Sequence, residues 1–144
     1  MNSLPGIITA IESNDHLSLV DVLVGQDSFT AMLLETPQSA PHLKVGNRVA
    51  VLFKETEVSL AKNLSGQISL RNRIKGTVRS IRHGEILSEV VLECQGLNVT
   101  SIITSRAVKR LELHEGDEVE ALVKANEVSL MEASQLGESG ESMP

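Results

Sequence analysis

The short segment Gln67–Arg73 concentrates side chains that could bind an oxygen-rich anion. Ser69, Arg71 and Asn72 place a hydroxyl, a guanidinium and an amide within four residues. All three donate hydrogen bonds, and the guanidinium also carries a fixed positive charge. An ordinary edge strand could have the same composition, so this segment alone leaves an anion site and a structural strand as two open interpretations.

A second pair of polar residues, Thr104–Ser105, stands between an apolar stretch and a helical pattern that includes Val108 and Leu111. We expect Ser105 to be the N-cap of this helical turn. Backbone N–H groups at a helix start also attract anions, so capping and anion binding are compatible. Further along, Lys124–Ala125 ends another apolar stretch, where the lysine is either simply exposed or a second source of positive charge.

Charge is distributed unevenly along the chain. The 144 residues carry a formal net charge of −6, which argues against a general binder of nucleic-acid backbones, because such proteins are usually basic. Between Val58 and Gly84 there is no Asp or Glu, and this segment holds six basic residues, Lys62, Arg71, Arg73, Lys75, Arg79 and Arg82. It indicates either a local anion site or a solvated linker and strand face.

The chain contains an internal repeat with an offset of 70 residues. Lys54–Leu60 aligns with Lys124–Leu130, and Leu43–Gly46 aligns with Leu113–Gly116. Several such blocks in the same order indicate a duplication. One pair, Leu17–Ser18 with Ile86–Leu87, aligns at an offset of 69 and predicts that one loop differs in length by a residue.

Each repeat predicts five short strands with Gly-containing turns and one helical turn, the parts of a small closed barrel. We therefore expect an all-β fold of two tandem OB-like five-stranded barrels, each with one short helix and each closed by its own fifth strand. The expected strands are 6–11, 17–24, 29–34, 48–53 and 58–60 in the first repeat, and 76–81, 86–94, 99–104, 118–124 and 128–130 in the second. The expected domains are 1–62 and 67–131, followed by a disordered tail at 132–144.

The two repeats differ where the candidate anion groups lie. Gln67–Arg73 predicts an extra strand before the second repeat, whereas only Met1, Asn2 and Ser3 stand before the first. The first repeat also has Glu35 and Glu55 where the second has Ser105 and Ala125, and a carboxylate would repel an anion. The second repeat is thus predicted to carry most of the anion chemistry.

In this context the residues resemble a known family. Ile68–Val78 is similar to the opening of the molybdenum-pterin-binding-protein (molbindin, or TOBE) domain, with the pattern S-x-R-N-x-x-x-G-x-V. The resemblance continues through Ser101–Thr104 and Leu122–Ala125 to Leu130, and the first repeat, from Leu4, looks like the diverged partner of paired versions. It covers nearly everything except the tail.

The resemblance implies a pair of OB-like barrels that binds molybdate or tungstate as a ligand, with no organic cofactor and no bare metal cation. It implies anions at domain interfaces of a homo-oligomer, with a trimer of two-domain chains favoured. Which subunit supplies each ligand stays open. The implied oxyanion-binding residues are Ser69, Arg71, Asn72, Thr104, Ser105, Lys124 and Ala125, with Lys54 and Lys75 as weaker candidates.

Other classes of function are less consistent with the composition. Four scattered histidines, without metal-ligand spacing or a nucleophile–base set, predict a protein that is not an enzyme. An OB-type nucleic-acid-binding module would need aromatic stacking platforms, but the only aromatic residues are Phe29 and Phe53. An oxyanion-sensing module linked to molybdate transport or gene control remains an alternative to storage or buffering.

The expected location is the cytoplasm, without a membrane partner. No stretch is long and apolar enough to span a membrane, and the first residues do not have the pattern of a signal peptide. Cys94 is the only cysteine, so no intramolecular disulfide can form, as is usual in a reducing compartment.

Overall fold

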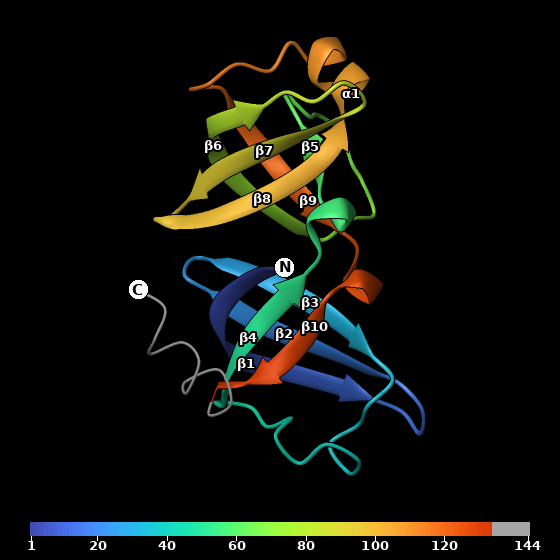
Figure 1. Ribbon diagram of the computed structural model, residues 1–144. Coiled ribbons are helices and arrows are strands. Elements are labelled where there is room, and N and C mark those ends of the chain that lie inside the picture. Colours follow the sequence, from blue (N-terminus) through green and yellow to red (C-terminus); the bar gives the residue numbers. More distant parts are fainter. Residues whose placement is uncertain (134–144) are drawn as a thin grey trace. The chain divides into compact units, whose positions relative to one another are not determined.

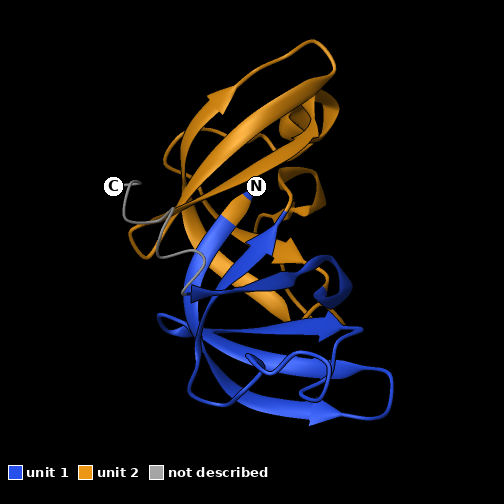
Figure 2. Cartoon of the chain, turned by 60° about the horizontal axis from the view of Figure 1, so that its bottom comes forward, with its two compact units in different colours: residues 1, 3–53, 125–144 blue, residues 2, 54–124 orange. Residues whose placement is uncertain are grey.

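The computed structural model describes residues 1–133, and its regular secondary structure is almost entirely β-strand (Figure 1). The chain forms two compact units. Unit 1 comprises Met1, Ser3–Phe53 and the described part of Ala125–Pro144, and unit 2 comprises Asn2 and Lys54–Lys124 (Figure 2). Each unit contains one five-stranded antiparallel sheet.

The sheet of unit 1 has the strand order β10-β4-β1-β2-β3. Its strands are β1 (Asn2–Ser13), β2 (Ser18–Val24), β3 (Asp27–Leu33), β4 (Arg48–Phe53) and β10 (Ser129–Glu132), and the 3-10 helix η2 (Ala125–Glu127) precedes β10. Alternate residues of β2 point inward, so Val20, Val22 and Val24 are buried. Phe29 and Phe53 stack in this core with ring centroids 6.1 Å apart.

The sheet of unit 2 has the equivalent order β5-β9-β6-β7-β8. Its elements are η1 (Glu55–Glu57), β5 (Ser59–Ala61), β6 (Asn72–Arg82), β7 (Leu87–Cys94), β8 (Leu97–Thr104), α1 (Ser105–Arg110) and β9 (Glu118–Val123). Val90, Leu92, Cys94 and Val99 form part of its buried core. A Cβ atom on Gly76 would lie 2.5 Å from Cys94 Sγ, so the close approach of β6 to the end of its neighbour β7 requires glycine there.

The closing strands do not follow the repeats. The sequence predicts that each repeat closes its own barrel, and this prediction is wrong. Strand β5 of the first repeat pairs with β9, with Leu60 opposite Ala121, and β10 of the second repeat pairs with β4, with Leu130 opposite Val51. Figure 2 shows the chain passing between the two colours accordingly. The repeat boundaries 1–62 and 67–131 therefore describe the duplication, whereas the compact units divide at Phe53–Lys54 and Lys124–Ala125.

The structural offset between the repeats is 70 throughout the loop where the sequence alignment predicts 69. Ser18 and Ser88 are both buried, and the irregularity in β1 between Ile8 and Ala10 recurs in β6 between Val78 and Ser80. The predicted difference in loop length is therefore wrong. The sequence alignment matched Leu17 with Ile86 because both side chains are hydrophobic. The structure instead matches Ser18 with Ser88, because both are buried.

The expected helical turn forms a regular helix only in the second repeat. There α1 covers Ser105–Arg110, but the corresponding segment of the first repeat has isolated turns, including a hydrogen bond from Ala40 N to Thr36 O of 2.8 Å. Pro37 and Pro41 explain the difference, because proline lacks a backbone N–H and disfavours a helical conformation in the preceding residue.

The prediction of a disordered tail at 132–144 is wrong for Glu132, which belongs to β10. Residues 134–144, the rest of that predicted tail, lie outside the described residues.

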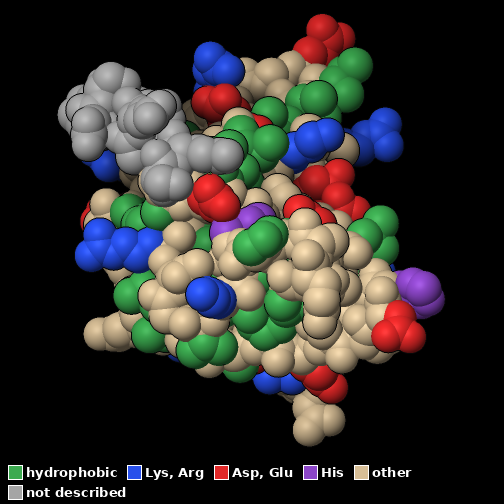
Figure 3. Space-filling view, turned by 90° about the horizontal axis from the view of Figure 1, so that it is seen from below, with side chains coloured by type: hydrophobic (Ala, Val, Ile, Leu, Met, Phe, Trp, Pro, Cys, Tyr) green, Lys and Arg blue, Asp and Glu red, His purple; other side chains and the backbone are tan. Residues whose placement is uncertain are grey.

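The outer faces of the two units have diverged. In unit 1, Ile7 pairs with Leu23 and Leu19 pairs with Met32, and these four side chains are between 36% and 46% exposed. The equivalent positions of unit 2, at the offset of 70, are Thr77, Glu93, Glu89 and Ile102. Figure 3 shows one face of the molecule, where hydrophobic side chains gather among charged ones. All four positions are therefore apolar in unit 1, whereas two of them, Glu89 and Glu93, are carboxylates in unit 2.

Candidate oxyanion site

Two charged candidates of the second repeat, Arg71 and Lys124, lie where β6 begins and β9 ends. The register of these strands places Asn72 opposite Val123. Arg71 precedes Asn72 and Lys124 follows Val123, so the antiparallel ladder brings the guanidinium and the ammonium group to the same end of the sheet. Both side chains are exposed, and within residues 1–133 neither forms an ion pair. This end of unit 2 presents two unneutralised cations to solvent.

Ser69 lies two residues before Arg71 in an exposed loop. The sequence predicts a strand over Gln67–Arg73, but the structure forms β6 only from Asn72, so the prediction of an extra strand is wrong for 67–71. The physical reason is that β9 ends at Val123, opposite Asn72, so no neighbouring strand continues beyond that point. The first strands of the two repeats begin at equivalent residues, Asn2 and Asn72.

The two equivalent asparagines are buried, unlike the neighbouring donors. Asn72 is only 1% exposed and Asn2 is 6% exposed. The Asn2 amide donates to Thr100 O and its Oδ1 accepts from Thr100 N, both at 2.8 Å. Asn2 thus shows that this position can serve a purely structural role, in which a side-chain amide pairs with a strand backbone. Ser69, Arg71 and Lys124 are the accessible donors.

Thr104 and Ser105 lie at the opposite end of unit 2. The register places Thr104 opposite Leu87, and β7 starts where β6 ends, with Arg82 opposite Glu89. Asn72 and Arg82 are separated by roughly 30 Å of strand at about 3.3 Å per residue. Figure 1 likewise shows α1 at the far end of unit 2 from the end of β9. Within one unit, the predicted site residues therefore form two separate groups.

The N-cap of α1 is Thr104 and not Ser105, which corrects the sequence prediction. The Thr104 hydroxyl accepts a hydrogen bond from Ala107 N at 3.1 Å. The Ser105 hydroxyl donates to Gly84 O at 2.7 Å and lies 2.8 Å from Ser88 Oγ, which must then be the donor in that contact. The hydrogen of Ser105 is thus used within unit 2.

The remaining candidates occupy less favourable places. Ala125 follows Lys124 and begins η2, and Lys54 is the exposed residue before η1. Lys75 lies opposite Glu120 in the ladder between β6 and β9. Its positive charge is therefore partly neutralised, unlike those of Arg71 and Lys124.

Two features of the site region have no counterpart in the sequence predictions. Glu120 accepts two hydrogen bonds from the Arg73 guanidinium, from Nε at 3.0 Å and from Nη2 at 2.9 Å. Lys62 Nζ donates to Leu111 O at 3.1 Å and to Glu112 O at 2.8 Å, next to the end of α1. Arg73 and Lys62 are both among the basic residues noted between Val58 and Gly84. Their hydrogen-bond acceptors, however, are identified only by the strand register and the packing of the linker.

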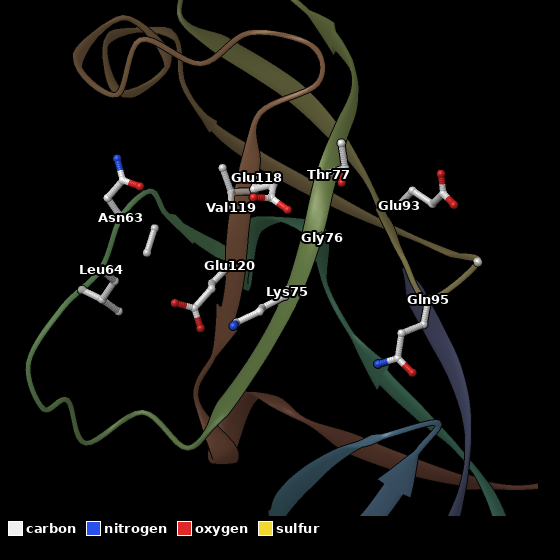
Figure 4. A pocket seen from close by; sticks show the side chains of 12 residues that line it. Asn63, Leu64, Lys75, Gly76, Thr77, Glu93, Gln95, Glu118, Val119 and Glu120 are labelled. Carbon is white, nitrogen blue, oxygen red and sulfur yellow. The ribbon is translucent and has the colours of Figure 1, made fainter.

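An open groove of about 590 Å³ lies beside this region on the outer surface of unit 2 (Figure 4). Lys75 and Thr77 of β6, Glu118 and Glu120 of β9, and Glu93 line it. Three carboxylates around one lysine make this groove unsuitable for an anion. No group of three or more His, Cys, Asp and Glu side chains in residues 1–133 is arranged to hold a metal ion.

Comparison with known proteins identifies the fold of the two units and then the family of the chain. A TOBE-domain model matches residues 68–130. The structure superposes with a TM-score of 0.85 on "the cytoplasmic molybdate-binding protein ModG", solved with molybdate bound, at 34% identity over 90% of this chain and 94% of that one. The two units are therefore OB-like TOBE barrels.

The sequence relatives agree with this class. Molybdenum-pterin-binding protein 1 of Clostridium pasteurianum is 43% identical over 65 residues, which are 44% of this chain and 96% of that protein. The chain belongs to the TOBE-domain (molbindin) family, as the sequence resemblance predicted, and is homologous to proteins of a non-enzymatic, binding class.

A longer relative contains a similar tandem module as one part. The molybdenum transport protein ModE of Herbaspirillum seropedicae is 30% identical over 127 residues, which are 86% of this chain. The chain spans about half, 47%, of the length of that relative. Within residues 1–133, no helix is long and apolar enough to cross a membrane.

Proposed function

We propose that this protein binds molybdate or tungstate in the cytoplasm and stores or buffers it. The observation that carries the proposal is the pairing of β6 with β9, which places Arg71 and Lys124 together as exposed cations at one end of unit 2. The ligand is inferred from the names of the relatives, because ModG is described as a cytoplasmic molybdate-binding protein.

The chemistry of these donors suits a tetrahedral dianion. Molybdate has four acceptor oxygens and no proton at neutral pH, so a site needs only donors and positive charge. Arg71 and Lys124 supply the charge, and the exposed Ser69 hydroxyl is the proposed directional donor. Charge-assisted hydrogen bonds contribute about 1.5–3 kcal/mol each, so three or four are consistent with micromolar affinity.

A homo-oligomer is the proposed form of the complete site. Thr104 and Ser105 lie at the other end of unit 2 from Arg71, so they can join one site with it only if a second copy of the chain supplies one group. The exposed apolar residues of unit 1, including Ile7 and Leu23, give such copies a surface to bury. We propose a trimer of two-domain chains.

A sensing role is the second candidate, because a similar tandem module occurs within the longer transport protein ModE. Native mass spectrometry with molybdate separates the two roles. Several anions per oligomer support storage, whereas one or two support sensing. A role in binding single-stranded nucleic acid is disfavoured, since the only aromatic residues, Phe29 and Phe53, are buried against each other.

Calorimetry with sodium molybdate tests the site. We expect Arg71→Ala and Lys124→Ala each to weaken binding at least about tenfold, because each removes a charge-assisted contact worth about 1.5–3 kcal/mol. Lys44→Ala, which removes an exposed lysine of unit 1, is the control and should bind as the unmodified protein does. Unchanged affinity in both site variants would reject this assignment.

A further inference from the structure

Three cations follow one another on the outer side of β6 and its preceding loop. Arg71, Arg73 and Lys75 are separated by two residues each, and the residues between them, Asn72 and Ile74, are buried. Alternate residues of a strand point to the same face, so Arg73 and Lys75 share the outer face of unit 2, and the exposed Arg71 directly precedes the strand. Without a compensating charge, this row would give the anion site at Arg71 an excess of positive potential.

Glu120 of β9 lies between two of these cations. Its carboxylate accepts a bidentate pair of hydrogen bonds from Arg73, and it stands opposite Lys75 in the ladder. Figure 4 shows the side chains of Lys75 and Glu120 extending side by side from the two strands. Hydrogen bonding by Arg73 lowers the pKa of the Glu120 carboxyl below its ordinary value, and Lys75 adds a smaller effect in the same direction. The carboxylate is therefore ionised near neutral pH.

The sign of the charge changes along this face. Beyond Lys75, the outer face carries Glu118 and Glu93 in the groove of Figure 4. Before Arg73, the chain carries Arg71 next to the end of β9 and Lys124. Arg73 and Glu120 thus lie at the boundary between a cationic end, where the anion is proposed to bind, and an acidic groove, where it is not.

Unit 1 provides an internal comparison. At the offset of 70, its equivalents of Arg71, Arg73 and Glu120 are Met1, Ser3 and Ala50. Unit 1 nevertheless forms the same five-stranded order, with β1 beside β4. The ion pair is therefore not needed to build the sheet, and it is present only in the unit that also has the cations of the proposed anion site.

We propose that Glu120 tunes the affinity of the anion site without touching the anion: by neutralising Arg73, it limits the positive charge next to the bound oxyanion to that of Arg71 and Lys124. Two charges match a dianion such as molybdate. This inference rests on the proposed function, and it predicts that removing Glu120 strengthens anion binding. A merely structural ion pair predicts the opposite sign.

Calorimetry with sodium molybdate on the full chain tests this role of Glu120. Circular dichroism verifies that each variant is folded. At low ionic strength, Glu120→Gln should bind molybdate about threefold more tightly, because Arg73 gains an unopposed charge within a Debye length of the anion. Arg73→Gln should bind about threefold more weakly, because Glu120 then opposes Arg71. The double variant should return to within about twofold of the unmodified protein. At about 0.5 M salt all three differences should shrink.

The control is Glu12→Gln. Glu12 is an exposed carboxylate of β1 in unit 1, the unit that holds none of the proposed anion-binding charges, so its loss should leave molybdate affinity unchanged. Equal or weaker molybdate binding by Glu120→Gln would overturn this inference but not the proposed function. Loss of folding in Glu120→Gln would also overturn it, because the ion pair would then be structural. If the unmodified protein shows no binding to molybdate, the proposed function fails, and this inference fails with it.

Discussion

The Ser101 hydroxyl donates a buried hydrogen bond of 2.7 Å to the carbonyl oxygen of Val58. Ser101 belongs to β8 in the second repeat, whereas Val58 lies in the first repeat, between η1 and β5. The bond therefore fixes the exchanged segment within unit 2. At the equivalent position of unit 1 stands Ala31, which shows that the site accommodates alanine sterically in the same fold.

Replacement of Ser101 by alanine should destabilise the protein by about 1–3 kcal/mol. The cause is that the buried Val58 carbonyl would lose its hydrogen-bond donor without gaining water. The free energy of unfolding in urea measures the effect. Ser80→Ala, which changes an exposed serine of β6, should change this free energy by less than about 0.5 kcal/mol. If Ser101→Ala is as mild as this control, the hydrogen bond does not hold the exchanged segment.

Stability in acid should depend on Asp117. The backbone N–H of His114 and then the Lys62 ammonium hold the pKa of the Asp117 carboxyl below its ordinary value of 3.8. A carboxyl with a lowered pKa stabilises the fold above its ordinary pKa, and this contribution is lost as the pH falls through the folded value. Asp117 therefore contributes fully near neutral pH, and its contribution starts to decline once the pH falls below about 4.

Urea unfolding at several pH values tests this contribution of Asp117. Compared with the unmodified protein, Asp117→Asn should be less stable at pH 7, and the difference should become smaller as the pH falls below about 4. Asp15→Asn, in an exposed turn of unit 1, serves as the control. A stability difference that stays constant down to pH 2 would show that Asp117 acts by geometry and not by charge.

Cleavage of the linker should leave the two fragments associated. A protease site inserted between Ser65 and Gly66 would cut after β5, in an exposed loop. The N-terminal fragment then holds β5, which is paired with β9, and the C-terminal fragment holds β10, which is paired with β4. Each unit would thus contain strands from both fragments.

Size-exclusion chromatography after cleavage measures whether the two fragments stay associated. Under native conditions the cut protein should elute with the intact protein, and the fragments should separate only in denaturant. A cut protein with Leu130→Pro and Met131→Pro should release its fragments more readily, because proline removes backbone donors from β10. Two folded fragments that separate in native buffer would contradict the exchange of closing strands.

Local patterns in the sequence were sufficient for much of the fold. Alternating apolar residues predicted the strands, and the recurrence of Lys54–Leu60 as Lys124–Leu130 predicted two similar units. The cluster Ser69–Asn72 and Lys124 were also predicted to be anion donors from their side-chain types, and this stays a prediction. These features depend on side-chain chemistry and on residues near one another in the chain, which a sequence displays directly.

Other features depended on which strands pair. The closing segments Val58–Leu60 and Val128–Leu130 are identical in sequence, and the strands that accept them are also equivalent. Local preference therefore could not decide which barrel each segment closes. The same limit hid Glu120, because its position beside Arg73 arises from residues 47 apart in the chain.

The sequence by itself determined the duplicated all-β architecture and the family, and it supplied the candidate donors of the proposed anion site, because periodicity and donor chemistry are local properties. The tertiary structure alone decided that the closing strands are exchanged, that Arg71 and Lys124 share one end of unit 2 while Thr104 lies at the other, and that Arg73 is neutralised. Those outcomes follow from strand register, which sets long-range neighbours and is not encoded in any short stretch of the chain.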